Sequence, residues 1–526
     1  MAIAAFCAAL VERGRSRPEA PAYVCGDAVL TCGELLADAA RIAAGLRARG
    51  VAPGARVALV LPAGLPFVRG FAGVTLAGAV PFAIPATLHA RTATRRAERG
   101  LPALLLTAET RNAELAAMAA GFAVASLEPL LAAPPPAGDL RPVEVEAEAP
   151  AFLQLTSGTT GEPRLAQLSH RALAAWRRSI AGAFDSGAGD VLVGWVPPWH
   201  VMGLVRFVLQ PILSGVVAHL VLPEVGRLAE WLETVARVRG TFTSAPDFAL
   251  RTAVRMAGDR ALDLGSLRLV VTGGEPVRLA TIRAFESRFG LPGVVRPAYG
   301  LSEATLAVTA VAPGEPLAVD ATGNVSCGRP LPGFELRVVD ANGADCAAGE
   351  PGEIRVRSES LFSGYFEPGG PDTGMLRDGW LATGDWGRLG AQGELYVLGR
   401  RRNLLKHGGA TYAPRELEDA AIEVAGVLAS AAISLRDRAR GEELPVLVVE
   451  RATGAAGSPA DLARAVAESV RRELGILPGE VLIVAPGTLP RTDNGKLRHG
   501  ELRRLLSAGE LESRRVLCGR ADGWTE

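Results

Sequence analysis

The regular alternation of strand and helix signals is the feature that most restricts how this chain can fold. Residues 56–62 form a buried apolar run typical of a strand, residues 66–76 have helical signals, and residues 80–84 form a second apolar run. A strand, a helix and a second strand in this order pair in parallel, with the helix as the crossover. The same alternation resumes beyond the proline-rich segment 132–138. The sequence therefore predicts an α/β protein built from βαβ-type subdomains.

Two changes of pattern divide the rest of the chain. From about residue 325 to 400, short strand signals alternate with glycine and proline turns, which predicts a small β-rich subdomain. From about residue 403 onward, strand and helix signals alternate in a new pattern, with a helix that begins at Ser458-Pro459. Residues 399–403 are polar and very basic. We therefore predict a large N-terminal domain at 1–400, a hinge at 399–403 and a small α+β C-terminal domain at 403–526.

Composition excludes several classes of protein. Hydrophobic residues make up 48% of the 526 residues and charged residues 21%, which excludes a disordered chain. Fifty-six basic residues balance 56 acidic ones, so no overall field attracts nucleic acid or a membrane surface. The longest apolar stretch, Leu204–Pro223, contains Arg206 and Pro211 and is not a uniform membrane span. Six scattered cysteines without a CxxC spacing fit a reducing cytosol. We expect a cytoplasmic enzyme, and the sequence gives no signal for its oligomeric state.

A loop rich in serine, threonine and glycine follows the apolar strand signal of residues 152–155. Residues 156–164 read TSGTTGEPR. Its glycines let the backbone bend, and its hydroxyl and N–H groups can surround phosphate oxygens. The loop does not match the Walker A pattern. Taken alone, it is compatible with phosphate binding and with an ordinary surface loop.

The whole string TSGTTGEPR resembles the signature loop of the adenylate-forming superfamily, which comprises acyl-CoA synthetases, fatty acyl-AMP ligases, luciferases and peptide-synthetase adenylation domains. Further matches occur in family order along nearly the whole chain. Thr272–Val277 resembles the loop along the adenine, Tyr299–Glu303 the YGxTE motif, residues 383–385 the TGD segment, and Leu489–Lys496 the loop of the catalytic lysine. The chain is thus identified as similar to this superfamily over most of its length.

The resemblance implies a complete ATP site. In the family the tyrosine of YGxTE stacks on adenine, the hydroxyl (here Ser302) meets the α-phosphate, and the TGD aspartate accepts hydrogen bonds from the ribose. The family's glutamate that holds Mg²⁺ corresponds to Glu303, and Thr160 is a second candidate ligand. Arg164 stands where the family usually has lysine, and we expect it to keep a contact with pyrophosphate. The implied ATP and AMP contacts are Thr156, Ser157, Gly158, Thr159, Thr160, Gly161, Arg164, Gly273, Gly274, Glu275, Pro276, Tyr299, Gly300, Ser302, Asp385 and Arg400.

Single residues in this set have simpler explanations. Asp385 could be a turn aspartate, Glu303 a charge favoured at a helix N-terminus, and Lys496 an exposed tip after Asn494-Gly495. The occurrence of all the pieces in family order favours the nucleotide site.

Lysine is used at only two positions, because every basic residue except Lys406 and Lys496 is arginine. In the implied reaction a carboxylate attacks the α-phosphorus of ATP and pyrophosphate leaves. Both reactants are anionic, so positive charge must be placed where negative charge builds up. A lysine ammonium is a compact point charge on a long stem, unlike a planar guanidinium. We therefore predict Lys496 to be the catalytic cation, together with Glu303 and His200.

The family likeness also implies a second half-reaction. The small C-terminal domain of the family rotates after adenylation, and Arg402 falls at the hinge position. The loop containing Lys406, Gly408 and Gly409 would then approach to deliver a thiol. Two roles stay open for Lys406, contact with a pantetheine phosphate and that of a solvated loop lysine.

The segment Gly194–Leu204 is most similar to the fatty acyl-AMP ligase version of its motif, although Val201 replaces an aspartate of that branch. It implies an acyl pocket formed by Trp199, His200, Gly203 and Ser244. A packed histidine is the alternative for His200. An amino-acid substrate would need an anionic partner for its ammonium, and no acidic residue clearly takes that role. A hydrophobic acid is therefore favoured.

Two features concern the acceptor of the acyl group. The linker between residues 366 and 380 is short where fatty acyl-AMP ligases commonly carry an insertion that disfavours CoA. Residues 404–418 have the GG…P spacing common in CoA ligases. The acceptor therefore stays open between carrier-protein phosphopantetheine and CoA.

The sequence thus predicts ATP-dependent formation of an acyl-AMP with transfer to a thiol, in lipid or secondary-metabolite biosynthesis. The alternative is a non-adenylating relative that only binds or uses a preformed acyl-AMP. Its mark would be loss of Lys496, Glu303 or Asp385, and all three are present.

Overall fold

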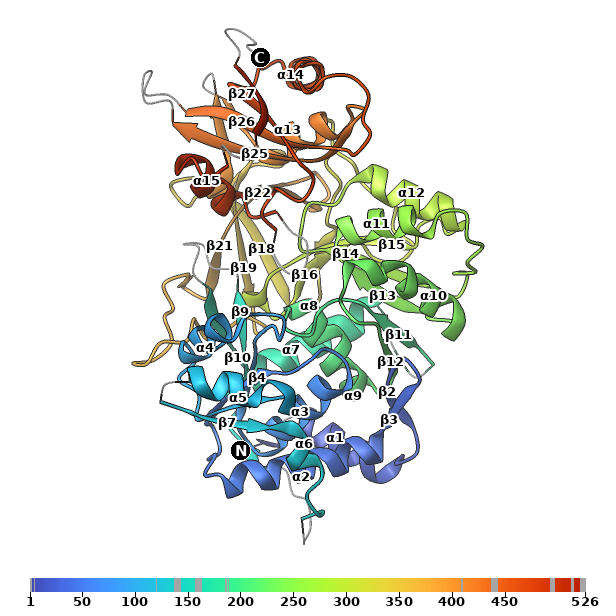
Figure 1. The fold of residues 1–526 in the computed structure, drawn as a ribbon, viewed down its shortest axis with the longest axis vertical. Helices are drawn as coiled ribbons and strands as arrows, with labels where there is room; N and C mark the ends of the chain where they lie inside the picture. The colour runs from blue at the N-terminus through green and yellow to red at the C-terminus, as the bar shows by residue number, and fades with distance from the viewer. Residues whose placement is uncertain are drawn as a thin grey trace. The chain divides into compact units, whose positions relative to one another are not determined.

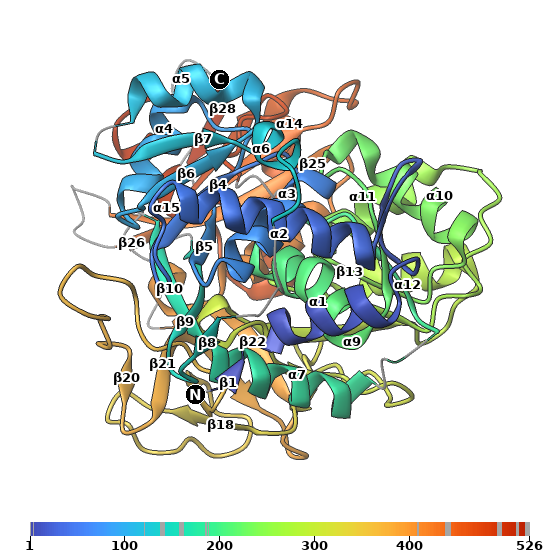
Figure 2. The same cartoon turned by 90° about the horizontal axis from the view of Figure 1, so that it is seen from below.

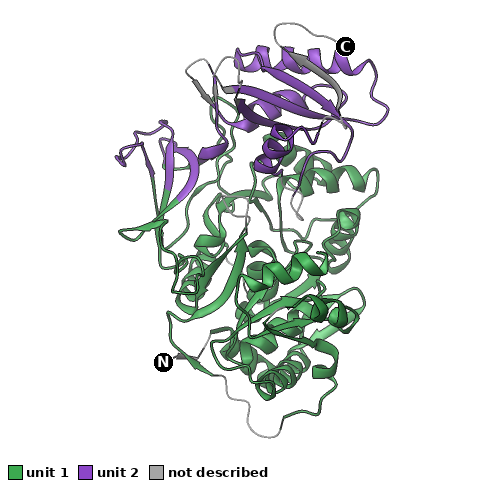
Figure 3. Cartoon of the chain, turned by 60° about the vertical axis from the view of Figure 1, so that its left-hand side comes forward, with its two compact units in different colours: residues 1–337, 355–382, 393–395 green, residues 338–354, 383–392, 396–526 purple. Residues whose placement is uncertain are grey.

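The chain folds into two compact units (Figures 1 and 3). Unit 1 comprises residues 1–337, 355–382 and 393–395, and unit 2 comprises residues 338–354, 383–392 and 396–526. The computed structural model describes residues 2–3, 5–119, 121–136, 143–156, 163–184, 187, 189–407, 410–436, 443–491, 497–511 and 515–520. The predicted domain boundaries and hinge stay predictions.

A six-stranded sheet in unit 1 is formed by the predicted βαβ elements. Its order is β10-β9-β5-β4-β6-β7, and all neighbours are parallel except the hairpin of β9 and β10. Its strands are β4 (Arg56–Val60), β5 (Val80–Ala83), β6 (Leu104–Thr107), β7 (Ala123–Ser126), β9 (Pro150–Thr156) and β10 (Arg164–Ser169). Four successive residues of β5 and of β6 are buried, as expected of parallel strands covered on both faces.

A nine-stranded sheet forms the other half of unit 1. Its order is β17-β16-β15-β14-β13-β11-β12-β2-β3, and the run from β15 to β2 is parallel. Its strands are β2 (Pro21–Cys25), β3 (Ala28–Thr31), β11 (Val191–Gly194), β12 (Val217–Leu220), β13 (Phe242–Ala245), β14 (Leu269–Gly273), β15 (Val295–Gly300), β16 (Ala307–Ala310) and β17 (Arg329–Pro330). A separate short pair joins β1 (Ala2–Ile3) to β8 (Glu144–Val145).

Helices connect and cover these strands. Figure 2 shows α1 beside α2, which also packs on α3. The helices of unit 1 are α1 (Ala5–Ser16), α2 (Cys32–Ala48), α3 (Leu65–Leu76), α4 (Ala90–Glu98), α5 (Glu109–Met118), α6 (Leu127–Leu131), α7 (His170–Phe184), α8 (Val201–Gly203), α9 (Gln210–Ser214), α10 (Leu228–Val238), α11 (Asp247–Ala257) and α12 (Leu279–Phe289). Short turns of other helix types are η1 (Leu204–Leu209, a π-helix), η2 (Val225–Arg227) and η3 (Ser302–Ala304).

Local sequence accounts for the start of α2 and for the packing of α10 to α12. Thr31 accepts from the N–H of Glu34, whose carboxylate accepts from the N–H of Thr31, so a capping box satisfies two N–H groups at the first turn. Trp231 of α10 and Phe285 of α12 are fully buried in one apolar cluster with strands of the nine-stranded sheet. Burial of such large side chains stabilises the layer by about 2–3 kcal/mol each.

Unit 2 has its own four-stranded sheet, of order β25-β26-β27-β28. Successive residues of β26 belong to two different apolar clusters, with Leu447 and Val449 packed among α13 and α14 residues, and Val446 and Val448 in a cluster with Leu502 of α15. Period-two alternation therefore gives the sheet a core on each face. The elements are β23 (Leu405–His407), β24 (Ala410–Tyr412), β25 (Val427–Arg436), β26 (Glu443–Arg451), β27 (Glu480–Val484), β28 (Arg515–Arg520), η4 (Arg401–Asn403), α13 (Pro414–Ile422), α14 (Pro459–Leu474) and α15 (His499–Ser507).

The predicted β-rich segment forms a five-stranded sheet. Its order is β18-β19-β21-β20, with β22 paired to β21. The strands are β18 (Phe334–Val339), β19 (Gly352–Ser358), β20 (Leu376–Arg377), β21 (Trp380–Leu389) and β22 (Leu395–Arg400). The predicted α/β fold class is confirmed. Within the described part of the chain, no helix is both long enough and apolar enough to cross a membrane.

Arg206 is a charged residue inside the core of unit 1. It lies on η1, is 1% exposed, and donates a hydrogen bond of 2.8 Å to Gln210 Oε1. The rings of Phe242 and Phe184 lie 4.4 Å and 5.6 Å from its guanidinium carbon, and no described carboxylate forms an ion pair with it. Burial lowers the pKa of Arg206 to about 9. The charge is thus held without an anionic partner among the residues that the structure describes.

Replacement of this arginine tests whether the buried charge destabilises unit 1. We expect Arg206→Met to raise the free energy of unfolding by about 1–2 kcal/mol, since methionine fills similar space without the cost of burying a charge. The gain should be nearly constant between pH 6 and 8, because the lowered folded-state pKa of about 9 still leaves the arginine mostly charged in both states over this range. Urea unfolding at these pH values measures it. A lower stability of the variant would mean that the two phenylalanine rings more than repay the burial cost.

Candidate active site

The carboxyl ends of four adjacent parallel strands carry most of the predicted site of unit 1. β15, β14, β13 and β11 are consecutive in the nine-stranded sheet and run in the same direction. Parallel strands place their carboxyl ends at one edge, where ligands bind in open α/β sheets. Tyr299 and Gly300 end β15, Gly273 ends β14, Ser244 is the penultimate residue of β13, and Trp199 and His200 follow β11. These predicted residues are therefore gathered along one edge of the sheet.

The segment after β11 leads into α8 through His200. The Leu204 N–H donates to the carbonyl of His200 over 2.8 Å, and the His200 N–H donates to the carbonyl of Pro197 over 3.0 Å. Trp199 is buried, and its carbonyl accepts a 2.9 Å hydrogen bond from Gln154 Nε2 of β9. A Cβ on Gly203 would lie 2.0 Å from the Pro197 oxygen, so only glycine fits there. The segment is thus fixed against both sheets of unit 1.

The turn after β14 combines a tight strand contact with a backbone reversal. A Cβ on Gly273 would lie 2.3 Å from the Ala298 oxygen of β15, and Gly274 has a φ of +79°. Both positions therefore need glycine. The carboxylate of Glu275 accepts a 2.7 Å hydrogen bond from the Phe248 N–H at the first turn of α11. The predicted adenine loop, which continues through Pro276, is thereby joined to the helix that follows Ser244.

Glu303 lies just beyond β15 on the short helix η3, together with Ser302. Glu303 is 8% exposed, and its Oε1 accepts a 2.5 Å hydrogen bond from the Tyr365 hydroxyl. Tyr299, near the end of β15, is also buried. Among the described residues no arginine, lysine or histidine forms an ion pair with Glu303. A buried carboxylate in this state favours binding of a cation.

Thr156 and Arg164 flank the signature loop as a paired position of the β9–β10 hairpin. Thr156 Oγ1 donates to the Arg164 carbonyl over 3.2 Å. The guanidinium of Arg164 pairs with the Asp372 carboxylate and lies 3.6 Å above the centre of the Tyr365 ring. Ser157, Gly158, Thr159, Thr160 and Gly161 lie outside the described residues. The hairpin that presents the loop is therefore connected to Glu303 through Tyr365.

Several buried polar atoms near this edge have no hydrogen-bond partner among the described residues. They are Trp199 Nε1, Ser244 Oγ, Thr272 Oγ1 and Gln154 Oε1. Thr272 is paired with Ala245 on the neighbouring strand, next to Ser244. Buried polar groups are normally hydrogen-bonded, so such a group of atoms indicates a place for a ligand or ordered water.

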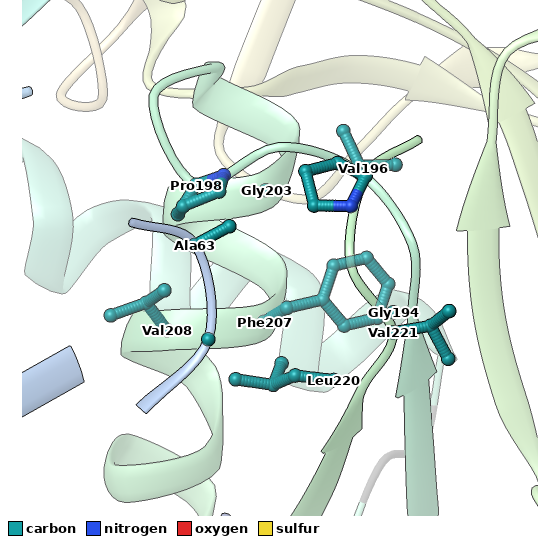
Figure 4. A pocket seen from close by; sticks show the side chains of 11 residues that line it. Ala63, Gly194, Val196, Pro198, Gly203, Phe207, Val208, Leu220 and Val221 are labelled. Atoms are coloured by element: carbon teal, nitrogen blue, oxygen red, sulfur yellow. The ribbon is translucent and has the colours of Figure 1, made fainter. Parts of the chain in front are cut away.

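An apolar cavity lies beside the segment that carries His200 (Figure 4). Pro198, Gly203 and Phe207 line it from this segment. The remaining lining residues are Ala63, Gly64, Gly194, Val196, Val208, Leu220, Val221 and Pro223. Of the four residues predicted to form the acyl pocket, Gly203 lines this cavity, whereas Trp199, His200 and Ser244 are not among its lining residues.

Unit 2 carries the predicted ribose contacts. Asp385 lies in β21, not in a turn. Its Oδ1 forms an ion pair with Arg400 Nε at a distance of 2.8 Å. Arg400 also donates to the Thr383 carbonyl over 3.0 Å. Gly384, which separates Thr383 from Asp385 in the sequence, has a φ of +69°, a backbone conformation that favours glycine. Asp385 and Arg400 therefore form a preorganised pair.

Other predicted residues of unit 2 are partly described. Arg402 lies in the single turn η4, and Lys406 lies in β23, with its side chain outside the described atoms. Gly408, Gly409 and Lys496 lie outside the described residues. Their predicted roles stay predictions.

Three residues of the site were missed by sequence reasoning. Tyr365, Asp372 and Gln154 each contact a predicted residue, but none belongs to a motif assigned to the nucleotide. Their contacts join segments up to 208 residues apart in the sequence. The one available signal was the polar Gln154 within an apolar strand, because a central strand rarely buries an amide without a partner.

Glycine turns and polar side chains at the carboxyl ends of adjacent parallel strands define an α/β nucleotide-binding enzyme. The family model "AMP-binding enzyme" matches residues 10–366. The chain is 30% identical to the long-chain-fatty-acid–AMP ligase FadD28 of Mycobacterium tuberculosis, over 95% of this chain and 97% of that protein. It belongs to the AMP-binding enzyme family, which confirms the predicted resemblance.

Two further relatives agree with this assignment. A 4-hydroxyphenylalkanoate adenylyltransferase of Mycobacterium tuberculosis is 30% identical, over 85% of this chain and 81% of that protein. A solved structure from a study of fatty acyl-adenylate ligases from E. coli and L. pneumophila superimposes with a TM-score of 0.84 at 26% identity, over 97% of this chain and 98% of that chain.

Proposed function

We propose that the protein activates a hydrophobic carboxylic acid with ATP, forming an acyl-AMP and pyrophosphate, and then transfers the acyl group to a pantetheine thiol. The observation that carries the proposal is the convergence of Tyr299, Gly273 and His200 at the carboxyl ends of adjacent parallel strands. The names of the relatives support it, because they include a fatty-acid–AMP ligase and an adenylyltransferase.

In this reaction the residues of unit 1 bind and orient the nucleotide. The ring of Tyr299 would stack on adenine along the Gly274–Pro276 turn, and the hydroxyl of Ser302 would meet the α-phosphate. Thr156 and the loop after it would surround the outer phosphates, with Arg164 supplying positive charge at its end. From unit 2, Asp385 would accept hydrogen bonds from the ribose, held in place by Arg400. Lys496 would supply the charge that lets two anions react.

Magnesium fits the residues present. The described residues contain no cluster of three or more acidic, histidine or cysteine side chains that could hold a metal alone. Mg²⁺ in nucleotide sites commonly takes one or two carboxylates together with phosphate oxygens. Glu303 is a buried carboxylate of this kind, and Thr160 stays a second candidate. The ion would neutralise phosphate oxygens when bound.

The acid is proposed to have an apolar tail. The cavity in Figure 4 is lined by apolar side chains and glycine beside the segment of His200, and with a volume of about 20 Å³ it would have to widen to take an acyl tail. His200 would then lie near the reacting carboxylate. Carrier-protein phosphopantetheine and CoA are both possible acceptors, and the loop with Lys406 would face the thiol after rotation at Arg402.

Trapping of the activated acid tests the proposal. The protein is incubated with MgATP, hydroxylamine and a panel of fatty and aryl acids, and hydroxamate is measured. We expect hydroxamate with hydrophobic acids and none with amino acids. Intact-mass analysis of CoA and of a phosphopantetheinylated carrier protein then identifies the acceptor. No hydroxamate and no pyrophosphate exchange with any acid would favour the non-adenylating alternative.

The Asp385–Arg400 pair gives a prediction specific to the nucleotide. We expect Asp385→Asn to raise the KM for ATP about 10–100-fold, because hydrogen bonds to a charged acceptor contribute about 1.5–3 kcal/mol. The KM for the acid should change little, since the predicted contact is to ribose. Steady-state kinetics with each substrate varied in turn measure the two values. An equal rise in both KM values would contradict a ribose contact.

A further inference from the structure

Tyr365 is fixed by the backbone between the signature hairpin and Glu303. The segment around it lies antiparallel to β10, with hydrogen bonds from Ser363 N–H to the Gln167 carbonyl and from Gln167 N–H to the Gly364 carbonyl, both 2.9 Å. The Phe362 N–H donates to the carbonyl of Glu303 over 2.8 Å. One short segment is therefore bonded both to β10, the strand that leaves the signature loop, and to the backbone of Glu303.

The glycine before Tyr365 is required by this arrangement. Gly364 has a φ of +130°, and a Cβ there would lie 2.7 Å from the Asp372 carbonyl oxygen. Tyr365 and Asp372 exchange two backbone hydrogen bonds of 2.9 and 2.7 Å. The direction of the Tyr365 side chain is thus set by a rigid backbone and not by packing alone.

The side chain of Tyr365 has a different partner on its ring and on its hydroxyl. It is 4% exposed, and its hydroxyl donates to Glu303 Oε1 over 2.5 Å. The Arg164 guanidinium covers the ring face at 3.6 Å and is itself held by Asp372. A cation over the ring draws electron density from it, which strengthens the phenol as a donor to a carboxylate. Arg164 therefore contacts the ring of the residue whose hydroxyl is bonded to Glu303.

We propose that Tyr365 is a positioning residue for the magnesium-binding carboxylate, and that Arg164 supports it by stacking on the tyrosine ring. With Oε1 held by the hydroxyl, Oε2 has a fixed direction for the metal. Hydrogen-bonding partners of metal ligands typically change metal affinity about 10–100-fold. The proposal rests on the proposed function, because it requires Mg²⁺ at Glu303.

Binding of a non-reactive nucleotide tests this without turnover. Calorimetry measures the affinity of α,β-methylene-ATP with and without Mg²⁺ for the wild type and for Tyr365→Phe. We expect the enhancement of affinity by Mg²⁺ to fall about 10-fold in the variant, while the affinity without Mg²⁺ stays the same. An unchanged enhancement, or an equal loss with and without the metal, would overturn the proposal. No enhancement in the wild type would instead contradict the proposed magnesium site.

Tyr23→Phe is the matched control. Tyr23 is fully buried in β2 of the same unit, and its hydroxyl donates to the Val208 carbonyl over 2.5 Å. Both variants lose one short hydrogen bond from a buried phenol. We expect both to lower the melting temperature, but only Tyr365→Phe to change the Mg²⁺ enhancement. A change of similar size in Tyr23→Phe would assign the effect to general loss of stability and overturn the proposal.

A double-mutant cycle separates the two roles of Arg164. If Arg164 acts through the ring, Arg164→Gln reduces the Mg²⁺ enhancement in the wild type but not in Tyr365→Phe, because the hydroxyl is already absent. If it acts only on phosphate, it weakens the analogue equally in both backgrounds. We expect non-additive effects, and additive ones would contradict the stacking part of the proposal.

Discussion

Lys496→Ala is expected to lower the rate of acyl-AMP formation by about 10²–10³-fold, the range found when a preorganised charge-stabilising group is removed from an active site. The attacking carboxylate and the α-phosphate are both anionic, and the ammonium would lie between them in the adenylating conformation. Thioester formation from synthetic acyl-AMP should be spared, since the lysine is expected to leave the site after rotation at Arg402. Pyrophosphate exchange and thioester formation from added acyl-AMP measure the two steps separately.

Lys496→Arg is the matched variant, because it keeps the charge and changes only its shape. We expect it to lose most of the adenylation activity, as a planar guanidinium distributes its charge over a wider area than an ammonium. Activity near that of the wild type would show that shape does not matter at this position. An equal loss in both half-reactions for Lys496→Ala would contradict the two-conformation mechanism.

Much of the fold could be predicted because its signals are local. An apolar run such as residues 80–84 is recognised from a few consecutive positions, and the structure places β5 at Val80–Ala83 as expected. The helix begun by Ser458-Pro459 likewise starts at Pro459, with Ser458 accepting from the Asp461 N–H. Period and capping chemistry therefore identify such elements without knowledge of any long-range contact.

The candidate site was predictable only where a motif is contiguous. Gly273 is the last residue of β14 and Gly274 follows it directly, so their position at the carboxyl end of the strand is a consequence of sequence order. By contrast, Tyr365 contacts Glu303, which lies 62 residues away, and the pairing depends on how the segment after Ser360 lies against β10. Such a contact has no periodic signal, because it is created by register between segments that the chain brings together only on folding. The hydrogen bond from the Phe248 N–H to the Glu275 carboxylate could not be predicted for the same reason.

A buried aspartate outside the candidate site, Asp190, provides the control for a prediction about Glu303. Asp190 is 8% exposed in unit 1, and its carboxylate pairs with Arg268 over 2.8 Å. Burial alone would raise the pKa of Asp190, but hydrogen bonds from Arg268, Thr241 and the Gly187 N–H outweigh it and lower the pKa below its usual value. Asp190→Asn should therefore lower stability near neutral pH and leave pyrophosphate exchange per folded molecule unchanged, since the pair belongs to no predicted contact of the substrates.

Glu303→Gln is expected to reduce MgATP-dependent adenylation by about 10²–10³-fold while preserving the fold. Glutamine has the shape of glutamate and its amide oxygen can still accept from the Tyr365 hydroxyl, so the structural hydrogen bond survives while the charge is removed. The buried site then lacks the anion that draws Mg²⁺ to the phosphates. Exchange measured against Mg²⁺ concentration, together with the melting temperature, separates this effect from that of Asp190→Asn. Full activity of Glu303→Gln at ordinary Mg²⁺ would show that the metal is held elsewhere, and the carboxylate would then serve only to anchor Tyr365.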